Sequence, residues 1–235
     1  SNCVEKSNYI GEALLSICYN RGMKVIPREA QLVATNSTAI RKLRTSLLLN
    51  QTQRFVLIGS LLGDGCLVPN SWKKHYRLFI IQSEKQKDYL NWKYKIFENF
   101  ILSKPKYHEK TKSWRFRTIS HLEFTEYRKI FYPLNKKIVP EKIEELLIHP
   151  ISLAVWYMDD GSLHTRKNTF VLNTQSFSFE DNKKLQKCLL KNFGIDSSIN
   201  RDKKYWRLYI KQKSAKRFNV LIKEYVATLM NYKLL

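Results

Sequence analysis

Two nine-residue stretches, LIGSLLGDG at 57–65 and LAVWYMDDG at 153–161, decide the fold of this chain. Both are apolar runs with helical periodicity, and each stops at an acid that is followed by glycine. The two acids, Asp64 and Asp160, are 96 positions apart. Two helices that end on the same pair of residue types indicate that the chain contains a duplicated unit.

Two lysines support the duplication, because Lys137 and Lys233 are also 96 positions apart and each follows its aspartate by 73 positions. Further landmarks recur in the same order, with offsets that differ by three or four residues, as short loop changes allow. They are a glutamine in a strand-like run (Gln82, Gln175), Asn-Phe closing a helix (99–100, 192–193) and Trp-Arg in an alternating run (114–115, 206–207). Each half therefore reads helix, two strands, helix, two strands, helix.

The periodicity of the apolar residues places these elements along the chain. Three- and four-residue intervals predict helices at 88–100 and 179–193, and alternation predicts strands at 77–83, 112–119, 169–176 and 203–210. The motif helices are expected to begin near Gln51, with Asn50 or Thr52 as cap, and just after Pro150. The predicted domains are an N-terminal helical extension (1–50), a first repeat (51–145) and a second repeat (146–235).

Two glycines in the first motif helix predict close packing between the two motif helices. Gly59 and Gly63 are four positions apart and so lie on one face, although glycine costs about 1 kcal/mol relative to alanine inside a helix. Close packing would bring the helix ends that carry Asp64 and Asp160 together. Two carboxylates at the negative poles of two helices repel each other, and a divalent cation would relieve that repulsion.

The charge of the chain narrows the class of its partner. Forty-two Lys and Arg against twenty Asp and Glu give a formal net charge of +22, which predicts a polyanionic partner. Thirteen Tyr, twelve Phe and five Trp are interleaved with the basic residues, a composition that favours nucleic acid over a membrane surface. No apolar run is long enough to span a bilayer, and the start does not resemble a signal peptide.

The alternating strands carry basic residues on one side only. In 203–210 the apolar residues face one way and Arg207, Tyr209 and Lys211 face the other, so one side packs on helices and the other is basic. Two such faces related by the repeat fit duplex DNA, although an ordinary solvated sheet face is the alternative. The predicted DNA-binding residues are Lys73, Lys74, Arg77, Arg115, Arg117, Arg166, Lys167, Arg201, Lys203, Arg207 and Lys211.

The four cysteines and five histidines show no spacing typical of a zinc site or a disulfide framework. Reduced thiols are typical of an intracellular protein, and we expect an organelle (mitochondrion or chloroplast) or a bacterial cytoplasm.

The paired motifs resemble those of the LAGLIDADG homing endonucleases, and in particular the single-chain, double-motif members of the omega-intron type. The first motif matches at its end, Gly63-Asp64-Gly65, and the second at Leu153-Ala154 and Asp160-Gly161. The blocks at 173–177 and 136–140 match as well, so the resemblance covers residues 51–235. It implies an α+β fold in which a pseudo-symmetric αββαββα repeat places two antiparallel sheets on DNA.

The resemblance also implies an activity and a set of site residues. A monomeric endodeoxyribonuclease would make a double-strand break at a long asymmetric site and so promote intron or intein mobility. Asp64 and Asp160 match the catalytic and metal-binding acids, which would hold Mg²⁺ or Mn²⁺. Lys137, Lys233, Gln82 and Gln175 match catalytic helpers, with simple phosphate binding as the alternative for the lysines.

Two positions depart from the motif. Asp159 stands where a small residue is expected, so we interpret it as a secondary group and not as the primary metal ligand. Val155 also replaces a small residue, so the motif does not by itself indicate how tightly the second helix packs there.

Three alternatives stay open. The extension is expected to contain helices at 11–19, 27–34 and 38–48, which either pack on the repeats or form a helix-turn-helix. The whole chain could act as an intron RNA maturase or as a DNA-binding regulator that does not cleave. A restriction-type site built from Asp160 and 181–183 is the weakest alternative, because it explains neither Asp64 nor the repeat.

Overall fold

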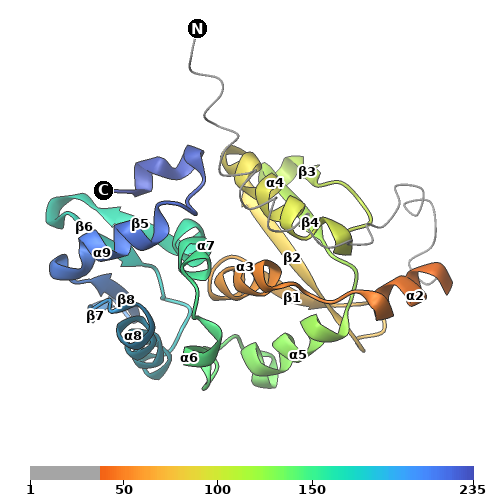
Figure 1. The fold of residues 1–235 in the computed structure, drawn as a ribbon, viewed down its shortest axis with the longest axis horizontal. Helices are drawn as coiled ribbons and strands as arrows, with labels where there is room; N and C mark the ends of the chain where they lie inside the picture. The colour runs from red at the N-terminus through yellow and green to blue at the C-terminus, as the bar shows by residue number, and fades with distance from the viewer. Residues whose placement is uncertain (1–37) are drawn as a thin grey trace, which may run out of the picture. The chain divides into compact units, whose positions relative to one another are not determined.

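The computed structural model describes residues 38–235, which form an α+β fold with two four-stranded antiparallel sheets (Figure 1). The strand order is β1-β2-β4-β3 in the first sheet and β5-β6-β8-β7 in the second, so one topology occurs twice. The predicted fold class and the duplication are therefore confirmed. Every helix of residues 38–235 is too short or too polar to cross a lipid bilayer.

The chain divides into two compact units. The first unit comprises residues 38–54 and 65–126, and the second comprises Phe55–Asp64 and Tyr127–Leu235. Helices α3 (Gln51–Leu62) and α5 (Leu122–Phe131) therefore belong partly to each unit. Both motif helices, apart from the first turn of α3, lie in the second unit.

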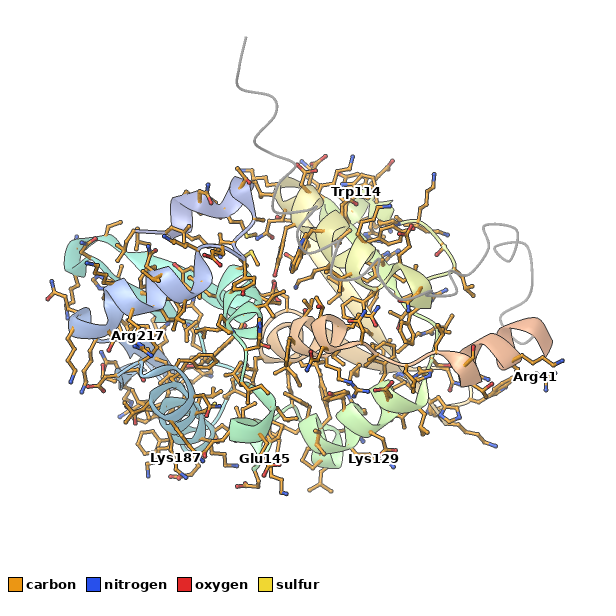
Figure 2. The ribbon with its side chains drawn as sticks, in the orientation of Figure 1. Arg41, Trp114, Lys129, Glu145, Lys187 and Arg217 are labelled. Carbon is orange, nitrogen blue, oxygen red and sulfur yellow. The ribbon has the colours of Figure 1, made fainter. Side chains whose placement is uncertain are left out.

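The first unit is a sheet covered on one face by a helix. Its elements, besides the parts of α3 and α5, are α2 (Thr38–Ser46), β1 (Cys66–Pro69), β2 (Tyr76–Ser83), η3 (Glu84–Gln86), α4 (Lys87–Ile96), η4 (Glu98–Phe100), β3 (Lys106–His108), η5 (Glu109–Thr111) and β4 (Ser113–Arg117). Trp114, labelled in Figure 2, and Phe116 face α4: the Lys87 ammonium lies 4.5 Å from the Trp114 ring centroid, and the Tyr94 and Phe116 rings are 6.0 Å apart.

The second unit repeats this plan with two helices on its sheet. Its elements, besides the parts of α3 and α5, are η6 (Pro133–Asn135), α6 (Ile143–Leu146), α7 (Pro150–Asp160), β5 (Gly161–His164), η7 (Thr165–Lys167), β6 (Thr169–Leu172), α8 (Phe179–Phe193), β7 (Ser197–Asp202), β8 (Tyr205–Ile210), α9 (Gln212–Ile222) and η8 (Thr228–Lys233). Figure 1 shows α8 and α9 against this sheet, where Phe179 of α8 contacts Trp206 and Phe218 of α9 contacts Phe170.

Local sequence explains where the long helices begin and end. Asn50 and Gln53 exchange side-chain to backbone hydrogen bonds at the start of α3, and Pro150 occupies the first turn of α7. Helix α8 begins with a capping box formed by Ser178 and Asp181. It ends at Gly194, whose φ of +64° favours glycine, while Arg217 of α9 (Figure 2) donates a hydrogen bond from Nε to the Phe193 carbonyl.

One predicted strand is too long. Alternation predicts a strand at 169–176, but β6 ends at Leu172. The chain turns there because the Asn173 amide donates to the Asp160 carbonyl, and the buried Thr174 hydroxyl donates to Asn182 of α8. Gln175 therefore lies in a turn and not in a strand.

The last part of the N-terminal extension packs on the first unit. Helix α2 ends at Ser46, and the chain after it buries Leu47 and Leu49. The Leu49 amide donates to Glu123 at 2.7 Å, and the Arg44 carbonyl is 3.0 Å from Nε2 of His121. The helices predicted at 11–19 and 27–34, and with them the helix-turn-helix alternative, lie outside the described residues.

The motif helices α3 and α7 meet through two complementary pairs of residues. A Cβ atom added to Gly59 would lie 2.7 Å from Cβ of Val155 and closer still to the Ser152 carbonyl oxygen. One added to Gly63 would lie 2.7 Å from Oδ2 of Asp159. In each pair, glycine on α3 or just after it accommodates a larger side chain of α7. Val155 therefore fills the space beside Gly59, and the predicted close packing of the two motif helices is confirmed.

This packing predicts that Gly59→Ala destabilises the protein. Helix propensity alone would favour alanine by about 1 kcal/mol, yet the new methyl group would overlap Ser152 and Val155. We expect a net loss of about 1 to 3 kcal/mol in the free energy of unfolding, measured by urea denaturation. Ser60→Ala is the matched control on the same helix, because the Ser60 hydroxyl is buried and has no hydrogen-bond partner among residues 38–235. A Gly59→Ala protein as stable as the control would contradict the proposed fit.

Candidate active site

The C-terminal ends of the two motif helices lie together in the second unit and carry the predicted acids. Asp160 is the last residue of α7, and Asp64 follows the end of α3 by two positions. The charges of Asp64, Asp159, Lys137 and Lys233 all act on the Asp160 carboxyl. The structure therefore gathers the four residues that the repeat spacing singled out.

The two lysines bind the helix-end carbonyl groups. Lys137 donates from Nζ to the Gly63 carbonyl at 2.7 Å, and Lys233 donates to the carbonyls of Met158 and Gly161 at 2.7 and 2.9 Å. The last carbonyls of a helix have no partner within it, and cations are favoured at this negative pole. Each ammonium group is therefore held at the end of one motif helix, beside its acid.

Tyr157 is a site residue that the sequence reasoning did not single out. Its hydroxyl donates to the Lys233 backbone carbonyl at 2.6 Å, while its ring packs between Phe170 and Phe218. Burial, and then the charge of Tyr232, raises the pKa of Tyr157, so the hydroxyl stays protonated as a donor. The sequence does indicate this residue: a tyrosine within an otherwise apolar helix is expected to be buried, and a buried hydroxyl needs a hydrogen-bond partner.

The two acids differ in their environment. Burial, together with the negative charges of Asp64 and Asp159, raises the pKa of Asp160 to about 7, although Lys137 and Lys233 oppose the shift. Asp64 is exposed to solvent. Burial also lowers the pKa of Lys233, against the effect of the three carboxylates. The site is therefore asymmetric, with its more desolvated half on α7.

Asp159 contacts the first half of the site directly. Its carboxylate lies over Gly63, and Oδ2 accepts a hydrogen bond from the Asp64 amide at 3.3 Å. Gly63 occupies the matching position of the first motif, so only one half carries the additional acid.

The carboxylates at this site suit a metal ion that is bound partly by the protein and partly by a substrate. Among residues 38–235, no three His, Cys, Asp or Glu side chains are arranged to hold an ion. Mg²⁺ is commonly bound by one or two carboxylates, with water and substrate phosphates completing its octahedral shell. The oxygen atoms of Asp64 and Asp160 fit that mode, and Asp160 is ionised more readily beside a cation.

The two predicted glutamines lie in different surroundings. Gln82 is buried in β2 of the first unit, opposite Trp114 in β4. Gln175 lies in the turn after β6, and its amide oxygen is assigned to the side that faces Arg207, because there it accepts from Nε and Nη2 at 2.6 and 2.7 Å. Their catalytic roles stay predictions.

In the first unit, strand register places three predicted DNA-binding arginines on one face. Arg115 and Arg117 are opposite Ile81 and Phe79, on the face away from α4, and Arg77 of β2 shares that face. Burial and then the charge of Arg117 lower the pKa of Arg77, so the two guanidinium groups repel each other. Lys73 and Lys74 lie in the hairpin between β1 and β2.

In the second unit the six predicted basic residues do not share one face of the sheet. Arg207 is on the face away from α8 and α9 and pairs with Asp202 at 2.8 Å, whereas Arg201 is opposite Trp206 on the helix-covered face. Lys211 lies beyond β8 and pairs with Asp196 at 3.1 Å. The remaining three are in hairpin connections: Arg166 and Lys167 in η7, and Lys203 between β7 and β8.

Comparison with known proteins identifies the class that this fold and site define. Residues 54–218 match the LAGLIDADG DNA endonuclease family. The chain belongs to this family, and the predicted enzyme class, an endodeoxyribonuclease, is confirmed.

Individual relatives show the same likeness along most of the chain. A protein of Wickerhamomyces canadensis, described as probable intron-encoded endonuclease 1, is 32% identical over 200 residues, covering 80% of this chain and 85% of the relative. DNA endonuclease I-ChuI of Chlamydomonas applanata is 27% identical over 208 residues, covering 79% and 95%. The solved structure of the homing endonuclease I-WcaI bound to its DNA recognition sequence has a TM-score of 0.79 and 28% identity, covering 90% of this chain and 99% of that one.

Proposed function

We propose that this protein makes a double-strand break in DNA by Mg²⁺-dependent phosphodiester hydrolysis at one long, asymmetric site. The observation that carries the proposal is the cluster at the ends of α3 and α7, where Asp64 and Asp160 meet Lys137 and Lys233. Paired carboxylates beside fixed ammonium groups suit the hydrolysis of a phosphodiester, whose transition state carries additional negative charge.

Each group at the site has a proposed role. Asp64 and Asp160 would hold Mg²⁺ or Mn²⁺, which supplies Lewis acidity and lowers the pKa of a bound water. Lys137 and Lys233 would stabilise the charge that develops on the two scissile phosphates, one for each strand. Their bonds to helix-end carbonyls fix the ammonium groups in advance, so little reorganisation accompanies the reaction. Gln82 and Gln175 would contact water or bases.

The basic sheet faces are the proposed DNA contacts. Arg77 and Arg117 repel each other in the free protein, and a phosphate group between them would remove that repulsion. The formal charge of +22 supports binding that weakens steeply with salt, because each neutralised phosphate releases counterions. A single chain with both motifs suits an asymmetric site and a monomer.

Intron mobility is the proposed biological role. The Wickerhamomyces relative is described as intron-encoded, and I-WcaI was solved on its recognition sequence. We propose the same role here, in a reducing compartment of an organelle or a bacterium, with the repeats at 51–145 and 146–235 as its two halves.

RNA maturation is the second candidate. A relative from Debaryomyces hansenii, 27% identical over 191 residues and covering 76% of this chain and 72% of the relative, is described as the cytochrome b mRNA maturase bI2. An intron RNA would contact the same basic surface, and the two retained acids favour DNA cleavage without excluding this role.

The deciding experiment is selection of cleaved sites from a randomised duplex library. With Mg²⁺ we expect enrichment of one long asymmetric sequence cut on both strands, and no cleavage with EDTA. In parallel, the protein is incubated with the RNA of an intron that is inserted at the selected DNA site, and splicing of that RNA is measured. Splicing enhancement without any cleaved duplex would overturn the nuclease proposal in favour of the maturase.

A further inference from the structure

Asp64 and Asp160 are held in place by different means. Asp160 is part of α7, and its carbonyl accepts the Asn173 amide at 2.8 Å, which connects it to the end of β6. Asp64 lies beyond α3 and is exposed. Its amide donates a hydrogen bond to Oδ2 of Asp159, a residue of the opposite motif helix.

The absence of a side chain at Gly63 leaves room for the Asp159 carboxylate between the two motifs. Gly63 and Asp159 occupy matching positions of the repeat, and they face each other at the C-terminal ends of the two motif helices. With any side chain at 63, its Cβ would lie within 2.7 Å of Oδ2 of Asp159, which is too close. Glycine in one motif therefore leaves room for the carboxylate of the other, and that carboxylate reaches the Asp64 amide.

We infer that Asp159 is a positioning residue for Asp64. By accepting the Asp64 amide hydrogen, it fixes the backbone from which the exposed catalytic carboxylate extends. A carboxylate that holds a metal must be oriented accurately, and mutation of a group that orients a metal ligand typically costs about 10- to 100-fold in metal affinity or activity. The inference rests on the proposed function, because it assigns Asp64 to the reaction.

The chemistry of the contact separates positioning from two simpler roles. An asparagine at 159 keeps the size of the side chain and a carbonyl oxygen that accepts the amide hydrogen, but it has no charge. An alanine removes the acceptor. If Asp159 acts only through its charge, the two substitutions have equal effects. If it only fills space, alanine changes stability without changing how Asp64 is held, and asparagine changes neither.

The test compares Asp159→Asn and Asp159→Ala in the full chain, with Asp88→Ala on the exposed surface of α4 as control. Amide hydrogen exchange at Asp64 is measured by NMR in metal-free protein. Single-turnover cleavage and the Mg²⁺ concentration for half-maximal rate are measured on a plasmid with the selected site. Thermal unfolding confirms that every variant is folded at the assay temperature.

We expect Asp159→Ala to lose the protection of the Asp64 amide, to cleave about 10- to 100-fold more slowly and to need more Mg²⁺. Asp159→Asn should recover the protection and most of the rate. Equal impairment of both variants, or an alanine variant that keeps the protection and the wild-type rate, would overturn the inference. A wild-type protein that never cleaves would refute the proposed function instead, while the exchange measurement would still report on the contact.

Discussion

Replacing Asp160 with asparagine is expected to slow double-strand cleavage by about 10³-fold or more, which corresponds to about 4 kcal/mol of transition-state stabilisation. The amide keeps the size of the carboxylate but has no charge to hold a divalent cation against a phosphate. DNA affinity should stay equal or increase slightly, since the substitution removes a negative charge that faces a polyanion. The matching Asp64→Asn variant should behave in the same way.

The measurement follows supercoiled plasmid through nicked to linear DNA, with affinity measured separately by fluorescence anisotropy in Ca²⁺. Asp88→Asn is the control, because it makes the same chemical change on the exposed surface of α4. If each acid is needed for cleavage of one DNA strand, the variants should accumulate nicked plasmid. The ratio of nicked to linear product then measures how much each half of the site contributes to cleavage. Wild-type cleavage by either variant would remove that aspartate from the mechanism.

The repeat spacing made most of the fold predictable. Periodicity predicts both ends of α8 correctly and β2 to within one residue, because each element carries its own apolar pattern. It failed at 169–176, where the hydrogen bond between Thr174 and Asn182 ends the strand. That bond joins residues of different elements, and local alternation contains no information about it.

The sequence predicts which residues form the candidate site but not the contacts that they make. Equal intervals identified Asp64, Asp160, Lys137 and Lys233, because a duplicated fold repeats its site at the same offset. The hydrogen bonds of the two lysines to helix-end carbonyls join residues that are far apart in the sequence. Residue spacing does not predict how the chain folds back to bring them together. Likewise, the sequence shows only that Val155 departs from the motif, and the structure shows that it packs against Gly59.

The pKa of Asp160 predicts a second large effect, on the stability of the metal-free protein. Its carboxyl titrates near 3.8 when unperturbed and at about 7 in the folded protein, mainly because it is buried beside Asp64 and Asp159. Between these values the folded state binds more protons than the unfolded state. The free energy of unfolding therefore falls as the pH rises from about 4 to about 7. Above that window the ionised carboxylate costs about 2 to 4 kcal/mol.

Asp160→Asn removes this cost, so in EDTA the variant should be about 2 to 4 kcal/mol more stable than wild type at pH 8 and about equally stable at pH 4. Urea denaturation at both pH values measures the difference, with Asp88→Asn as the exposed control. Mg²⁺ should stabilise the wild-type protein at pH 8 and have less effect on the variant, since binding to the folded state alone adds to its stability. A stability gain that is the same at both pH values would point to packing and not to charge. A gain confined to high pH would mean that the site loses stability by keeping a buried, ionised Asp160 beside Asp64 and Asp159, which is the condition that a bound cation relieves.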